Sequence, residues 1–133
     1  MSELLHVGLD VGSTTVKIIV MNKNGNTIYK NYQRHFSDTK NTVCSVLEDL
    51  LLKYPSNTFT IALTGSGAMS AAKFLGVDFI QEVVSCKRAV EKYIPKTDVV
   101  IELGGEDAKI IYFDQSIEQR MNGTCAGGTG AFL

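Results

Sequence analysis

Two short segments place a carboxylate at the end of an apolar strand, directly before a tight bend. In the first, the acid is Asp10, and the bend from Gly12 to Thr15 offers hydroxyls and backbone amides. Clustered N–H groups form a concavity that binds anions, so this bend suits a phosphate. Asp10 suits Mg²⁺, because hard cations prefer carboxylate oxygen and keep part of their water shell. The alternative is a plain strand–turn–strand in which Asp10 caps the turn.

The segment from Ile101 to Asp107 repeats this design further along the chain. Glu102 interrupts an apolar strand, and Gly104 and Gly105 then allow a ligand to approach the backbone closely. A buried carboxylate is costly unless it is paired or bound to a metal ion. The alternative is a Gly-Gly hairpin with a solvated Glu102. Two such elements in one chain favour ligand binding more strongly than either one alone.

A glycine-rich loop around Cys125 is the most specific feature of the sequence. Four glycines, at positions 123, 127, 128 and 130, surround this cysteine just before an expected helix. A thiolate is favoured at a helix amino terminus, and it is a natural ligand for an iron–sulfur cluster. A flexible loop with an incidental thiol is the equal alternative. Cys44 and Cys86 fall within helical patterns, where core packing is the expected role.

Composition and missing motifs exclude several classes of protein. The 133 residues are 44% hydrophobic with a formal net charge of −1, which fits a globular domain rather than a disordered chain. The 13 basic residues form no long run against 14 acidic ones, which argues against nucleic-acid binding. No membrane span or signal peptide is visible, so we expect a cytoplasmic protein. The Walker pattern is absent, so two bends rather than one phosphate loop would hold a nucleotide.

Hydrophobic periodicity predicts six strands and three helices. The predicted strands cover residues 5–11, 15–21, 27–34, 58–63, 99–103 and 109–113. The predicted helices cover residues 38–54, 68–75 and 81–93. The almost continuous apolar run 99–103 is typical of a buried central strand. We interpret the turn from Thr64 to Gly67 as structural, although it could line a site. The order predicts an α/β fold in which helices cover a mixed sheet.

These segments together resemble the actin–hexokinase–heat-shock ATPase superfamily. Asp10-Val-Gly-Ser-Thr-Thr15 is similar to its first phosphate motif, and Glu102-Leu-Gly-Gly-Glu-Asp-Ala-Lys109 to its second. The segment Asn122–Leu133 resembles the cysteine loop of the 2-hydroxyacyl-CoA dehydratase activators. These belong to the BadF/BadG/BcrA/BcrD ATPase family, which includes benzoyl-CoA reductase subunits. The resemblance covers essentially the whole chain, with the motifs in the same order.

The resemblance implies a ribonuclease-H-like, actin-like ATPase lobe with a mixed five-stranded sheet. It also implies that two such lobes bind ATP and Mg²⁺ between them. It implies catalytic roles for Asp10 and Glu102 near Mg²⁺ and the attacking water, with Asp10 as the magnesium ligand. The residues that it implies for cofactor binding are Gly12, Ser13, Thr14, Thr15, Lys17, Gly104, Gly105, Glu106 and Asp107. It also implies a homodimer that bridges one [4Fe–4S] cluster, with Cys125 as an iron ligand.

The resemblance implies a function as well. ATP hydrolysis would drive a conformational change that pushes one low-potential electron into a partner dehydratase or reductase. Ferredoxin or flavodoxin would be the electron donor, in an anaerobic cytoplasm. Glu102 stands where many activators have Asp, and Glu106 where many have Gln. Both resemble a branch in which the activator is fused into a very long chain with dehydratase-like regions.

Residues 1–133 are expected to form a single amino-terminal ATPase lobe, cut before the second lobe. The second cluster cysteine and the adenosine-binding lobe would lie beyond Leu133, so we expect the 133 residues alone to be inactive. Two other functions stay open. One is a small-molecule kinase of the same superfamily, for which the Cys125 loop has no obvious use. The other is a non-hydrolytic, redox-sensing scaffold in which Cys125 is a reactive thiol.

Overall fold

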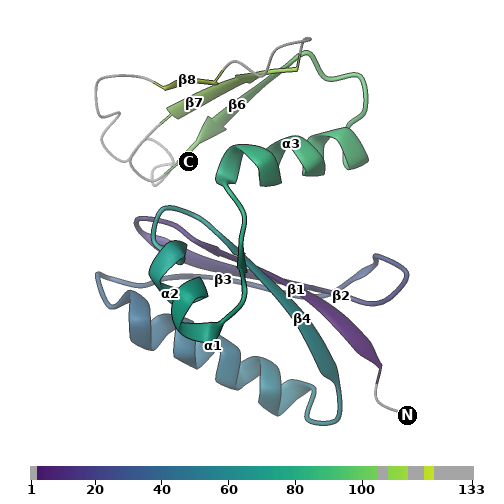
Figure 1. The fold of residues 1–133 in the computed structure, drawn as a ribbon, viewed down its shortest axis with the longest axis vertical. Coiled ribbons are helices and arrows are strands. Elements are labelled where there is room, and N and C mark those ends of the chain that lie inside the picture. The colour runs from purple at the N-terminus through teal and green to yellow at the C-terminus, as the bar shows by residue number, and fades with distance from the viewer. Residues whose placement is uncertain (1–2, 105–107, 114–118, 122–133) are drawn as a thin grey trace. The chain divides into compact units, whose positions relative to one another are not determined.

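The computed structural model describes residues 3–104, 108–113 and 119–121 (Figure 1). The chain divides into two compact units, Met1–Ile80 and Gln81–Leu133. Among the described residues, no helix has the length and apolar character that a bilayer crossing needs.

The first unit is built on a five-stranded mixed sheet with the strand order β3-β2-β1-β4-β5. Its strands are β1 (Leu4–Val11), β2 (Thr15–Met21), β3 (Thr27–Arg34), β4 (Thr58–Thr64) and β5 (Asp78–Phe79). The first three form an antiparallel meander, while β4 runs parallel to β1 and β5 runs parallel to β4. The predicted mixed five-stranded sheet is confirmed. The two-residue strand β5 is too short to have been predicted from periodicity.

Two helices, α1 (Thr39–Lys53) and α2 (Ala68–Leu75), pack on the sheet of the first unit (Figure 1). Alternate residues of β1 are buried, because successive side chains of a strand point to opposite faces. The helices contribute residues such as Val46, Leu50 and Ala72 to the same core. Asp38 caps α1 by accepting a hydrogen bond from the Asn41 amide. This packing holds the β1–β2 bend and the β4–α2 turn in place.

The second unit contains α3 (Glu82–Tyr93) and an antiparallel sheet with the order β6-β7-β8. Its strands are β6 (Val99–Leu103), β7 (Ala108–Tyr112) and β8 (Gln119–Met121). The prediction of a buried central strand at 99–103 is wrong. In the described sheet β6 is an edge strand, and Val99, Ile101 and Leu103 are exposed. A short apolar run looks the same in either position, because periodicity does not report the number of neighbouring strands.

Candidate functional site

Asp10 lies near the end of β1, opposite Lys17 on the antiparallel strand β2. The Lys17 ammonium donates to the Asp10 carboxylate at 2.8 Å, and both side chains stay partly open to solvent. Lys17 also lies over the ring of Tyr32, at 5.9 Å from the ring centroid. The predicted acid therefore stands beside a cation at the edge of the bend, where charged phosphate oxygens could be bound.

The bend between β1 and β2 is closed by a hydrogen bond from the Gly12 amide to the Thr15 carbonyl, at 2.9 Å. Thr15 is buried, whereas Ser13 is exposed and Thr14 is half-buried. Within the described residues, the amides of Ser13 and Thr14 donate to no protein group. These two adjacent amides are therefore available to an anion, and phosphate binding by the bend stays a prediction.

The turn from Thr64 to Gly67 approaches the same bend from β4. Gly65 has a φ of +105°, and a Cβ there would lie 2.3 Å from the Val11 carbonyl oxygen and 2.6 Å from Asp10 Oδ1. The Gly67 amide donates to the Val11 carbonyl at 2.8 Å. This turn therefore forms part of the Asp10 site. One signal could have located it, because the carboxyl ends of parallel strands meet at one sheet edge.

Thr64 is the partner of Asp10 in the parallel register of β4 and β1. Its hydroxyl oxygen is buried, and no group of the described residues hydrogen-bonds to it. A buried, unpartnered hydroxyl beside a carboxylate offers the oxygen ligands that Mg²⁺ and its bound waters prefer. The glycine at position 65 also keeps the space beside Asp10 free of a side chain. The residues present therefore fit a hydrated magnesium ion.

His35 is a second contributor that sequence reasoning missed. It is 6% exposed at the end of β3, and its Nε2 lies 3.2 Å from the Gly12 carbonyl oxygen. An isolated histidine in a polar segment carries no spacing that points to a site. Its role is visible only from the antiparallel pairing that brings β3 alongside the bend.

Glu102 is half-buried on β6 and faces Lys109 of β7 in the antiparallel register. Lys109 forms an ion pair with Glu82 of α3. Burial raises the pKa of the nearby Cys86 thiol, the Glu102 carboxylate raises it further, and Lys109 opposes the shift. This corner of the second unit therefore combines two acids, a lysine and a thiol.

The two acid-plus-bend segments share one spacing and one register. In each, glycine follows the acid by two positions and lysine follows it by seven. Asp10 faces Lys17, and Glu102 faces Lys109, across an antiparallel pair. Because they lie in different units, their convergence on one nucleotide stays a prediction.

Several predicted site residues lie outside the described residues, so their roles also stay predictions. They are Gly105, Glu106, Asp107 and Cys125. In the part of the chain that the structure describes, no cluster of three or more His, Cys, Asp or Glu side chains could hold a metal ion.

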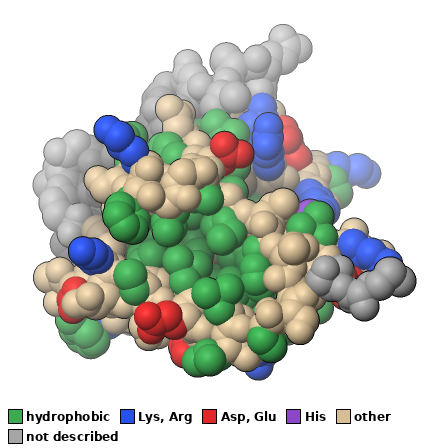
Figure 2. Space-filling model, turned by 60° about the horizontal axis from the view of Figure 1, so that its bottom comes forward, with side chains coloured by type: hydrophobic (Ala, Val, Ile, Leu, Met, Phe, Trp, Pro, Cys, Tyr) green, Lys and Arg blue, Asp and Glu red, His purple; other side chains and the backbone are tan. Residues whose placement is uncertain are grey.

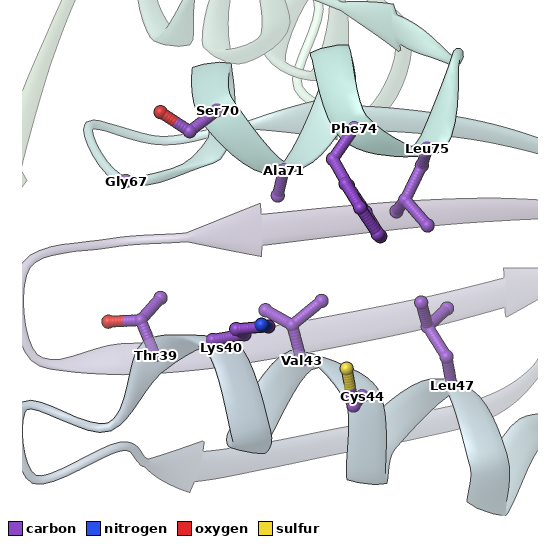
Figure 3. A pocket seen from close by; sticks show the side chains of 10 residues that line it. All are labelled: Thr39, Lys40, Val43, Cys44, Leu47, Gly67, Ser70, Ala71, Phe74 and Leu75. Atoms are coloured by element: carbon purple, nitrogen blue, oxygen red, sulfur yellow. The ribbon is translucent and has the colours of Figure 1, made fainter.

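An apolar groove of about 390 Å³ lies between α1 and α2. Figure 2 shows hydrophobic side chains gathered around a hollow on this face of the molecule. Figure 3 shows Ala71, Phe74 and Leu75 of α2 facing Val43 and Leu47 of α1 across the groove. Cys44 lines the groove and is exposed, so the expectation that it packs in the core is wrong. Position 44 is rotated about 100° around α1 from the buried position 43.

Comparison with known proteins points to one family. The model of the BadF/BadG/BcrA/BcrD ATPase family matches residues 7–133. The chain is 36% identical over 135 residues to a 2-hydroxyisocaproyl-CoA dehydratase activator of Clostridioides difficile, covering 96% of this chain and 49% of the relative. It is 32% identical over 133 residues to the (R)-2-hydroxyglutaryl-CoA dehydratase activating ATPase of Acidaminococcus fermentans, covering 96% and 50%.

Solved structures agree with these relatives. The activator of 2-hydroxyisocaproyl-CoA dehydratase from Clostridium difficile, with bound ADPNP, matches with a TM-score of 0.77 and 28% identity. That match covers 96% of this chain and 49% of the activator. Component A of the Acidaminococcus fermentans (R)-2-hydroxyglutaryl-CoA dehydratase matches with a TM-score of 0.74 and 25% identity, covering 97% and 51%. The chain therefore spans about half the length of the curated relatives that it matches.

Proposed function

The chain belongs to the BadF/BadG/BcrA/BcrD ATPase family, and we propose that it is the amino-terminal part of an ATP-hydrolysing activator. Its partner would be an enzyme of the 2-hydroxyacyl-CoA dehydratase or benzoyl-CoA reductase type. The relatives named as dehydratase activators support this role, and one of them was solved with bound ADPNP. The actin-like ATPase fold is shared with those solved structures.

The observation that carries the proposal is the β1–β2 bend. The Ser13 and Thr14 amides have no hydrogen-bond partner among the described residues, and the bend that holds them joins the two strands that carry the Asp10–Lys17 pair. The amides and the Lys17 ammonium would bind phosphate oxygens of ATP. Asp10 and the Thr64 hydroxyl would hydrogen-bond to water molecules coordinated to Mg²⁺. The ion would neutralise part of the phosphate charge. The contacts with the amides and Lys17 would orient the phosphates. The glycines at 65 and 67 keep bulky side chains away from the bend.

The second phosphate motif would complete this site. Glu102 would orient the attacking water, and the backbone from Gly104 to Asp107 would contact the transferred phosphoryl group. The shared spacing of acid, glycine and lysine in the two segments supports a shared role. We keep the single lobe over residues 1–133 as part of this proposal, with adenosine bound by a second lobe.

Electron transfer rests on Cys125. Its thiolate would be one ligand of a [4Fe–4S] cluster shared by two copies of the protein, which requires a homodimer. Such a cluster supplies one-electron chemistry at low potential, and a ferredoxin or flavodoxin would reduce it. Support comes from the glycine-rich surroundings of this cysteine and from the relatives that activate dehydratases.

Anaerobic purification tests the proposal. The full-length protein, with its second lobe, should be brown and should bleach in air, and Cys125→Ser should remove the colour while ATP binding stays. Cys44→Ser is the matched control, because the Cys44 thiol is exposed on α1 and should leave the colour unchanged. Colourless protein that phosphorylates a metabolite would establish the kinase alternative. Colourless protein that binds ATP without hydrolysing it would favour the redox-sensing scaffold.

A further inference from the structure

His35 is buried at the junction between β3 and α1, where it contacts the β1–β2 bend. A buried imidazole needs hydrogen-bond partners for its ring nitrogens. The Ser37 amide donates to Nδ1 at 3.2 Å, and the Thr39 hydroxyl oxygen lies 3.4 Å from the same nitrogen. On the other side of the ring, Nε2 lies 3.2 Å from the Gly12 carbonyl oxygen.

These partners define the tautomer of the ring. An amide N–H can only donate, so Nδ1 must carry the lone pair that accepts from Ser37. A carbonyl oxygen can only accept, so Nε2 must carry the proton that is donated to Gly12. Both ring nitrogens of His35 are therefore engaged, Nε2 toward the bend and Nδ1 toward the start of α1.

The backbone around His35 is held in an unusual conformation. Phe36 and Ser37 have φ values of +48° and +68°, in the left-handed region that residues other than glycine rarely adopt. The His35 amide donates to the Thr14 carbonyl, and the Asp38 amide donates to the His35 carbonyl. Strained residues persist where the surrounding contacts over-determine them, and they cluster at ligand sites. Here the strained turn aims the imidazole at the bend.

The contact with Gly12 orients the amide that follows it. None of the described peptide bonds is cis, and a trans peptide group is close to planar, so the Gly12 carbonyl and the Ser13 N–H point in opposite directions. The Gly12 oxygen is held inward by His35, with Gly67 of the β4–α2 turn close by. The Ser13 amide must then point away from His35 and Gly67. A released carbonyl could rotate, and the amide would lose its direction.

We propose that His35 is a positioning residue for phosphate binding, which acts through the Gly12 carbonyl to aim the Ser13 amide at the phosphate of a bound nucleotide. This inference rests on the proposed function, because it assumes that the bend binds phosphate. His35 itself touches no ligand. The recognised group is a nucleotide phosphate, and the residue raises affinity by preorganising the amide before binding.

Two substitutions test the hydrogen bonds of the two His35 ring nitrogens separately. In His35→Gln the side-chain amide nitrogen reaches the Nε2 position and can still donate to Gly12. In His35→Asn the side-chain oxygen reaches the Nδ1 position and can accept from Ser37, but nothing reaches Gly12. The matched control is His6→Gln, since His6 also forms a histidine hydrogen bond, to Thr60 on the open sheet at 2.8 Å.

The measurement is the affinity of the whole protein for ADPNP with Mg²⁺, by calorimetric titration, alongside the midpoint of thermal unfolding. We expect His35→Asn to weaken ADPNP binding about fivefold or more, the loss of roughly one hydrogen bond. His35→Gln should stay within about twofold of wild type, as should His6→Gln. Equal affinities for the Asn variant and wild type would overturn the inference, as would equal losses in the Asn and Gln variants.

Misfolding of a variant and failure of the proposed function can each be told apart from failure of the inference. If the Asn variant does not fold, His35→Leu takes its place, because leucine also donates nothing to Gly12; a loss of about fivefold or more beside a near-wild-type Gln variant supports the inference, and a Leu variant within about twofold of wild type contradicts it. If the wild-type protein binds no ADPNP, the proposed function fails and the inference fails with it. Wild-type binding that is indifferent to position 35 overturns the inference alone.

Discussion

Lys17 donates to Asp10 across the β1–β2 pair at 2.8 Å, next to a bend whose Ser13 and Thr14 amides find no partner in the part of the chain that the structure describes. An ion pair this exposed adds about 0–1 kcal/mol to the free energy of unfolding. Its position matters more than its stabilising effect. With the positive charge beside the opening, a phosphate would find a cation and two N–H donors together.

Lys17→Gln should therefore separate stability from binding. The free energy of unfolding should fall by less than about 1 kcal/mol, measured by urea denaturation. The affinity for ADPNP with Mg²⁺ should fall about tenfold or more, because a hydrogen bond to a charged group contributes about 1.5–3 kcal/mol. Lys87→Gln is the matched control, since Lys87 forms a partly exposed pair with Glu91 at 3.6 Å within α3 of the second unit. An unchanged affinity in Lys17→Gln would remove this lysine from the site.

Relief of backbone strain before α1 should stabilise the first unit. Phe36 has a φ of +48° and its side chain is 83% exposed, so glycine at this position removes strain and sacrifices almost no buried apolar surface. A left-handed residue other than glycine costs about 1–2 kcal/mol, while glycine adds about 0.5–1 kcal/mol of chain entropy. Phe36→Gly should raise the free energy of unfolding by about 0.5–1 kcal/mol, measured by urea denaturation. A lower free energy of unfolding for Phe36→Gly would mean that the Phe36 side chain makes stabilising contacts despite its high exposure.

Most elements of the first unit were predictable because their apolar residues recur at strand or helix spacing, whereas the two-residue strand β5 was not. Alternation in β1 and the three- and four-residue spacing in α1 match their buried residues. The edge position of β6 was not predictable, because an apolar run does not show whether one strand or two will pair with it. Sequence reasoning found Asp10 from its place before the bend. It assigned no role to His35 and interpreted the turn from Thr64 to Gly67 as structural, because their contacts with the bend arise only when β3 and β4 pair beside it.

Cys86 should react slowly with alkylating reagents. Burial and the Glu102 carboxylate raise the pKa of its thiol, so the reactive thiolate is scarcer than in a free thiol at the same pH. The iodoacetamide reaction, followed by mass spectrometry of the Cys86 peptide, should lag behind that of glutathione at pH 8. Glu102→Gln removes the acidic neighbour and should speed the reaction, while Glu91→Gln serves as the control. A rate in Glu102→Gln equal to wild type would leave burial as the sole cause.

The raised thiol pKa of Cys86 also predicts a pH dependence of stability. The folded protein holds this proton at a pH where the unfolded chain has lost it, so the contribution is complete below the ordinary thiol pKa of about 9. It is then lost as pH rises through the higher folded pKa. Stability of the wild type, measured by urea denaturation from pH 7 to 11, should therefore fall more steeply above pH 9 than stability of Cys86→Ala. Parallel profiles would contradict the shift.

Alanine substitutions at Gly65 and at Gly8, as test and control, probe the packing of the β4–α2 turn against the β1–β2 bend. A Cβ at Gly65 would lie 2.3 Å from the Val11 carbonyl oxygen, at a φ of +105°, whereas a Cβ at Gly8 meets nothing within 4 Å. Gly65→Ala should therefore lower the free energy of unfolding by about 2–4 kcal/mol, from overlap and backbone strain together. It should also weaken ADPNP binding, because the displaced backbone lies against Asp10 and Val11. Gly8→Ala should be neutral or slightly stabilising, since alanine loses less chain entropy than glycine. Urea denaturation and calorimetric titration of both variants check this, and equal stabilities would show that the turn does not pack on the bend.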